Sequence, residues 1–98
     1  MSKKVYDITM STSLGKKYGT LTLSASVGKV YGTMSILGND NEITGSIAPN
    51  GSCELFGSFL TLMRAYEYKA VGAITKDLVE LSLTADGEVY SITGKGAL

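Results

Sequence analysis

Glycine recurs at one particular place in this sequence, inside the apolar register of alternating segments. Eight segments alternate apolar and polar residues, and six of them carry such a glycine, at positions 19, 32, 45, 57, 72 and 94. A glycine lacks the Cβ that would oppose a sharp inward bend, so it suits a strongly coiled strand. The pattern therefore predicts a small closed sheet.

The longest alternating stretch runs from Cys53 to Lys76 and predicts a long β-hairpin. Its two runs, CELFGSFLTLM and YEYKAVGAIT, meet at Arg64-Ala65. A two-residue turn at that point would pair Gly57 with Gly72 on the apolar face. We therefore expect this hairpin to form part of a barrel wall.

The other segments show the same alternation and are separated by short turns. The tetrapeptide GNDN at 38–41 is interpreted as a turn rather than a cation site, and Asp86-Gly87 predicts a type I′ turn with positive φ at both residues. Eight strands joined in sequence by short turns predict an all-β fold, a single eight-stranded antiparallel up-and-down (meander) β-barrel over residues 1–98. The alternative is a two-sheet sandwich, which would need longer crossovers.

The alternation also predicts which side chains point into the barrel, and the up-and-down order predicts at which end they lie. One end gathers tyrosines and adaptable or polar neighbours, with an arginine at the rim: Tyr66, Tyr68, Tyr90, Met10, Met63, Thr61 and Arg64. The opposite end gathers small apolar residues, expected to form a plug: Ala25, Val30, Ile47, Cys53, Ile74 and Val79. The two ends are therefore expected to differ chemically.

Several large apolar residues of the long hairpin have outward parity. They form a predicted interface patch: Phe56, Leu60, Leu62, Val71 and Ala73. A contiguous apolar patch on a small protein usually marks an interaction surface. We therefore expect a homo-oligomer, most simply a two-fold dimer that buries this hairpin.

The charge balance excludes some partners. Lysines plus arginines and acidic residues number nine each, so the chain has no basic excess to attract a nucleic acid.

No apolar run approaches the roughly 20 residues that span a bilayer, and MSKKVYDITM has no long apolar segment after its lysines. We expect a cytoplasmic protein without nucleic-acid or membrane partners.

The absence of histidine limits the chemistry. With no His and one cysteine, the sequence lacks the usual zinc and copper ligand sets and every catalytic arrangement that uses His. We therefore predict no metal, no cofactor and no catalytic residue. An enzyme with tyrosine as the acid and arginine as an anion clamp is the third-ranked hypothesis.

In its pattern of eight antiparallel strands in meander order, the chain resembles the calycin and avidin-like barrels, and it is similar to uncharacterised small bacterial proteins of this pattern. The resemblance covers the whole length. The chain has no Trp, and so no GxW signature of lipocalins, and it has no aromatic biotin-site motif. No ligand residue of either family is therefore assigned here.

Two functions follow from the predicted barrel. In the first, the barrel binds a small, mostly apolar ligand at its tyrosine-lined end, since an eight-stranded barrel has room for one small molecule. In the second, the barrel is filled and acts as a structural or interaction module through its outer surface. A cavity inside the barrel would distinguish the two.

Overall fold

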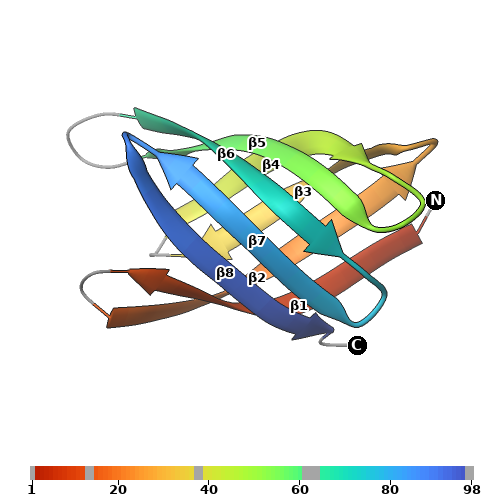
Figure 1. Ribbon diagram of the computed structural model, residues 1–98, viewed down its shortest axis with the longest axis horizontal. Helices are drawn as coiled ribbons and strands as arrows, with labels where there is room; N and C mark the ends of the chain where they lie inside the picture. The colour runs from red at the N-terminus through yellow and green to blue at the C-terminus, as the bar shows by residue number, and fades with distance from the viewer. Residues whose placement is uncertain (1, 13–14, 37–38, 61–64, 97–98) are drawn as a thin grey trace.

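The protein is an eight-stranded antiparallel β-barrel (Figure 1). The computed structural model describes residues 2–12, 15–36, 39–60 and 65–96. The strands are β1 (Ser2–Thr12), β2 (Gly15–Ser26), β3 (Lys29–Ile36), β4 (Asn39–Ile47), β5 (Ser52–Leu60), β6 (Ala65–Ile74), β7 (Leu78–Ala85) and β8 (Glu88–Gly96). Each strand pairs with the next in sequence, and β1 pairs with β8 to close the barrel. The predicted all-β meander barrel is confirmed.

The alternation of the sequence places one face of each strand inside the barrel. In β7 the burial alternates strictly, so that Val79, Leu81 and Leu83 are buried while their neighbours are exposed. The buried apolar core takes members from all eight strands, among them Ile8, Leu21, Met34, Ile43, Leu55, Ala70, Leu81 and Ile92. Across the described residues there is no helix long and apolar enough to cross a membrane.

Glycines on the inward face allow the close approach of neighbouring strands. A Cβ built on Gly32 would overlap the carbonyl group of Thr22, with the carbonyl carbon only 2.8 Å away. Gly32 lies next to Leu23 across the β2–β3 ladder, where any larger residue would push the two strands apart. The strands can therefore coil tightly enough to close the barrel.

Two tight turns have the same positive φ values. Asp86 and Gly87, between β7 and β8, have φ values of 50° and 79°, which confirms the predicted positive φ at both residues. Val27 and Gly28, between β2 and β3, have the same values. A β-branched residue such as valine rarely adopts this left-handed region, so Val27 occupies a strained position.

The register of the β5–β6 hairpin differs from the predicted one. Gly57 pairs with Tyr68, and Gly72 pairs with Cys53, so the predicted Gly57–Gly72 pair is wrong by four positions. The last pair before the connection is Leu60 with Ala65, which excludes a two-residue turn at 64–65. The observed register places the Tyr68 ring over Gly57, where a Cβ would lie 2.6 Å from the ring carbon Cζ. A shift by an even number leaves every side chain on its predicted face.

Candidate functional site

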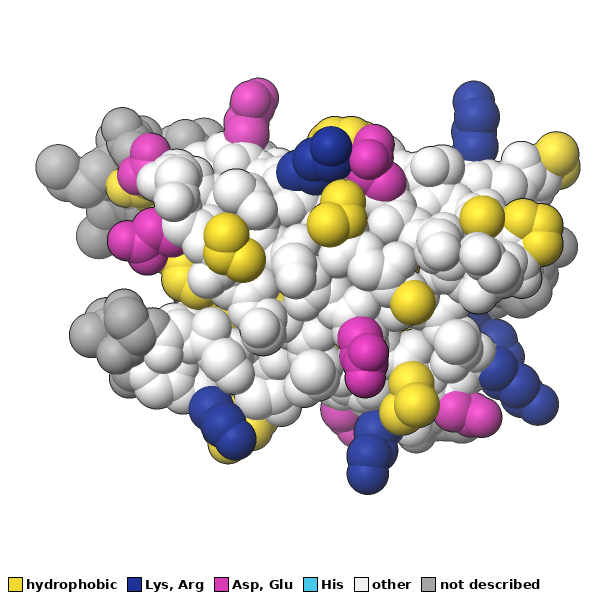
Figure 2. Space-filling model, in the orientation of Figure 1, with side chains coloured by type: hydrophobic (Ala, Val, Ile, Leu, Met, Phe, Trp, Pro, Cys, Tyr) yellow, Lys and Arg dark blue, Asp and Glu magenta, His cyan; other side chains and the backbone are white. Residues whose placement is uncertain are grey.

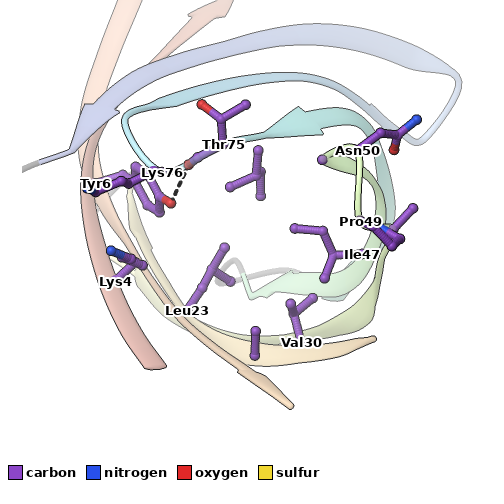
Figure 3. Close-up of a pocket in the computed structure, with 13 residues that line it drawn as sticks. Lys4, Tyr6, Leu23, Val30, Ile47, Pro49, Asn50, Thr75 and Lys76 are labelled. Atoms are coloured by element: carbon purple, nitrogen blue, oxygen red, sulfur yellow. Dashed lines mark hydrogen bonds between the residues drawn. The ribbon is translucent and has the colours of Figure 1, made fainter. Parts of the chain in front are cut away.

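A hollow opens at the end of the barrel where β1 begins (Figure 3). Its volume is about 380 Å³. Thirteen residues line it: Lys4, Tyr6, Leu23, Ala25, Val30, Ile47, Ala48, Pro49, Asn50, Gly51, Ile74, Thr75 and Lys76. The wall is mainly apolar, and its polar groups come from one tyrosine, two lysines, and the asparagine and threonine of two turns.

Four apolar residues of the wall are the inward residues nearest to the ends of their strands. Ala25 and Val30 are paired neighbours at the β2–β3 end, and Ile47 and Ile74 close β4 and β6. Alternation places all four on the inner face, at the mouth rather than in the middle of the barrel. The hollow is thus a direct continuation of the packed core.

The 48–51 turn forms one rim of the hollow and is held by backbone hydrogen bonds. The amide of Ala48 donates to the carbonyl of Ser52 at 2.8 Å, and the amide of Gly51 donates back to the carbonyl of Ala48 at 2.9 Å. The amide of Ile74 donates to the carbonyl of Gly51 at 2.9 Å, which ties this turn to β6. The rim is therefore fixed by its own main chain.

The predicted apolar plug at this end is confirmed in part. Val30 and Ile74 are buried in the core, Ile47 packs against the core, and Ala25 is exposed at the mouth; all four also line the hollow. Of the remaining members of the predicted plug, Cys53 and Val79 are buried in the core below.

Tyr6 places a hydroxyl group at the wall of the hollow. Its Oη donates a hydrogen bond of 2.7 Å to the carbonyl oxygen of Thr75 (Figure 3). Burial, and to a smaller extent the negative charge of Asp77, raise the pKa of Tyr6 above its usual value. The hydroxyl therefore stays protonated at neutral pH, and its oxygen keeps lone pairs that a ligand donor can approach.

The opposite end holds the predicted tyrosine cluster, of which the structure describes a part. Tyr68 and Met10 are buried, and Tyr66 and Tyr90 are half-buried. The Tyr90 hydroxyl donates to Glu88 Oε2 at 3.1 Å, and this hydrogen bond is the main reason why the pKa of Tyr90 is raised. The other members of the cluster, Thr61, Met63 and Arg64, lie outside the described residues. The tyrosine-lined mouth therefore stays a prediction.

Asn41 is a buried polar residue that was predicted to lie in a turn. It belongs to β4, its exposed fraction is 9%, and its side chain faces the core. Its Oδ1 accepts a hydrogen bond of 2.6 Å from the Tyr68 hydroxyl, and its Nδ2 donates to the Met34 carbonyl at 3.1 Å. Burial raises the pKa of Tyr68 above the usual range for tyrosine. The signal was available, because Asn41 is in the apolar register of Ile43 and Gly45.

The rest of the described chain offers little further chemistry. Within residues 2–12, 15–36, 39–60 and 65–96, no three His, Cys, Asp or Glu side chains are grouped to hold a metal ion. Cys53 is a free, buried cysteine, and burial raises the pKa of its thiol. A protonated, enclosed thiol is a poor nucleophile. The hollow is therefore the site that the geometry favours.

Comparison with known proteins supports the fold. No protein-family model matches the chain, and no curated protein matches it. Among solved structures, the chain is similar to a redesigned β-barrel, mFAP1, whose structure was determined with DFHBI bound. The TM-score is 0.57 at 12% sequence identity, and the match covers 95% of this chain and 91% of mFAP1. At this identity the likeness shows a shared eight-stranded barrel fold.

Proposed function

We propose that the protein binds one small, mostly apolar molecule in the hollow at the β1 end of the barrel. The observation that carries this proposal is the hollow itself, with a volume of about 380 Å³. Small-molecule pockets in proteins fall between about 300 and 1,000 Å³ and are mainly apolar with a few polar groups. The ligand's apolar body would contact Leu23, Val30 and Ile47, and a donor group would reach the Tyr6 hydroxyl oxygen.

The likeness to mFAP1 supports the same proposal, because that barrel holds a small molecule, DFHBI. The closed eight-stranded meander also agrees with the proposed resemblance to calycin and avidin-like barrels. The tyrosine-lined end, with Tyr68 and Tyr90, is a second candidate for the end at which a ligand enters the barrel. The experiment must therefore distinguish the two ends of the barrel.

A neutral fluorescent probe tests the proposal. We expect N-phenyl-1-naphthylamine to bind with 1:1 saturation and increased emission. Ala25→Trp, which fills the hollow from its wall, should weaken binding at least tenfold. Val89→Trp is the matched control, because Val89 is an exposed, outward residue near the opposite end and its replacement should leave binding unchanged.

The outcomes separate the candidates. If Ala25→Trp leaves binding unchanged while Tyr68→Phe and Tyr90→Phe weaken it, the ligand enters at the tyrosine end. If the wild-type protein shows no saturable binding, ligand binding in the barrel is wrong. Urea unfolding of each variant shows whether the barrel is still folded. A native mass spectrum of the purified protein would report any molecule that is already bound.

The alternative function is interaction through the outer surface. Phe56 and Val71 are 45% and 41% exposed on adjacent strands of the predicted interface patch. Between them Lys69 and Glu54 form an ion pair of 3.3 Å, and the Lys69 ammonium lies 6.0 Å from the centre of the Phe56 ring. Polar groups thus interrupt the described part of the patch, and Leu62 lies outside the described residues. On the face that Figure 2 shows, hydrophobic side chains likewise lie apart among polar ones.

The proposed homo-oligomer has a direct test. If a two-fold dimer buries the hairpin, sedimentation should show a dimer at micromolar concentration, and Leu60→Glu or Val71→Glu should convert it to a monomer. Thr20→Glu, at an outward and exposed position on β2, away from the β5–β6 hairpin, serves as the control. A wild-type monomer under these conditions would refute this alternative.

A further inference from the structure

We infer that the ligand of the hollow is an anionic amphiphile, with an apolar body inside the barrel and one negatively charged group at the mouth. This inference rests on the proposed function. Among the thirteen lining residues there are two lysines, Lys4 and Lys76, and no carboxylate. The whole chain has equal numbers of basic and acidic residues, so the excess of positive charge is local to this wall.

Lys4 occupies a position that alternation assigns to the inside of the barrel. It has the same parity in β1 as Tyr6, Ile8 and Met10, which are all buried. It pairs with Leu23, another residue of the hollow wall. An inward lysine is costly in a closed core because burial disfavours its charge. At the open mouth its stem can follow the apolar wall while the ammonium group stays in water.

Lys76 lies in the turn between β6 and β7, next to Thr75, whose carbonyl accepts the Tyr6 hydrogen bond. Figure 3 shows Lys4, Tyr6 and Lys76 on one side of the mouth, with Pro49 and Asn50 on the other. The charged group of a ligand would therefore lie on the β1 side. Its apolar body would extend toward the opposite wall and into the barrel.

One acidic residue lies close to this wall and reduces its charge. Asp77 follows Lys76 in the same turn, and its charge acts on the Tyr6 hydroxyl. Asp77 does not line the hollow, and two lysines against one aspartate still leave the mouth positive. A group with one negative charge would be attracted there, and a strongly basic ligand would be repelled.

The volume limits the size of the ligand. Liquid water occupies about 30 Å³ per molecule, so a hollow of about 380 Å³ holds the equivalent of about a dozen waters. A CH₂ group is of similar size to a water. The ligand is therefore a compact molecule, such as a medium-chain acyl anion or a two-ring aromatic acid, whose head group projects into solvent.

Two matched probes test the inference. They are 8-anilinonaphthalene-1-sulfonate and N-phenyl-1-naphthylamine, which share the ring system and differ by the sulfonate. We expect Lys4→Gln and Lys76→Gln each to weaken binding of the sulfonate two- to fivefold at low salt, because a solvent-exposed ion pair contributes up to about 1 kcal/mol. Binding of the neutral probe should not change. Lys16→Gln, which removes the same charge at the opposite end of the barrel, is the control.

Salt gives an independent readout. Raising the ionic strength to about 1 M shortens the screening length to about 3 Å, so affinity for the sulfonate should fall while affinity for the neutral probe stays constant. If both probes bind and neither responds to the lysine variants or salt, the inference is wrong and the proposed function stands. The proposed function itself is wrong if Ala25→Trp weakens the binding of neither probe. It is also wrong if neither probe shows saturable binding to the wild-type protein.

Discussion

The Val27-Gly28 turn contains a residue that opposes its own backbone conformation, so replacing it should stabilise the protein. Val27 has φ of 50° and its side chain is fully exposed, so no packing compensates for the strain. The left-handed region costs an ordinary L-residue roughly 1–2 kcal/mol, and among residues with a side chain asparagine tolerates it best. We expect Val27→Asn to raise the free energy of unfolding by about 1 kcal/mol, and the melting temperature by about 4–8 °C.

The equivalent turn at the other end of the barrel provides a reciprocal test. Asp86 has the same φ of 50° before Gly87, with a residue type that suits this conformation. Asp86→Val should therefore cost about 1 kcal/mol, plus whatever the carboxylate itself contributes. Because the two turns lie at opposite ends, the effects of Val27→Asn and Asp86→Val should be additive in the double variant.

Urea unfolding is the appropriate assay. An unchanged m-value shows that a variant has changed the stability rather than the denatured state. Val27→Thr is the matched control, since threonine is also β-branched and should leave the midpoint within about 0.3 kcal/mol of wild type. The reasoning is refuted if Val27→Asn and Val27→Thr give the same midpoint. It is also refuted if Asp86→Val is neutral.

Three further predictions follow from the structure. Gly32→Ala should destabilise the barrel by about 3 kcal/mol or more in urea, because its Cβ would overlap the Thr22 carbonyl group. Gly87→Val should cost at least about 1 kcal/mol, since Gly87 has φ of 79°, and an unchanged midpoint would contradict the turn. Tyr68→Phe should leave the barrel folded but cost about 1–2 kcal/mol at neutral pH, because Asn41 Oδ1 loses its donor. Because the pKa of Tyr68 is raised in the folded state, its protonated hydroxyl contributes its full stabilisation below about pH 10, and this contribution is lost as the pH rises further. The difference in unfolding free energy between wild type and Tyr68→Phe should therefore shrink in urea titrations at alkaline pH.

Alternation along the chain was enough to determine which face of each strand points inward, and the short turns determined the order of the strands round the barrel. Side chains alternate with a period of two, so parity assigns the inner face from local sequence alone. Short turns between consecutive strands leave little choice but a meander. The Asp86-Gly87 turn was also predictable from local sequence, because aspartate and glycine both tolerate positive φ, whereas Val27 adopts it against its residue type.

The register of the β5–β6 hairpin and the hollow at the β1 end were decided only by the tertiary structure. Parity is unchanged when a hairpin slips by an even number of residues, so the sequence could not distinguish Gly57 opposite Gly72 from Gly57 opposite Tyr68. Parity with Ile43 directs Asn41 inward, but its hydrogen-bond partner Tyr68 is 27 residues away in the chain, and only the folded barrel brings the two together. The hollow is lined by residues from five strands, β1, β2, β3, β4 and β6, and from the turns after β4 and β6, so it forms only when the barrel brings these segments together.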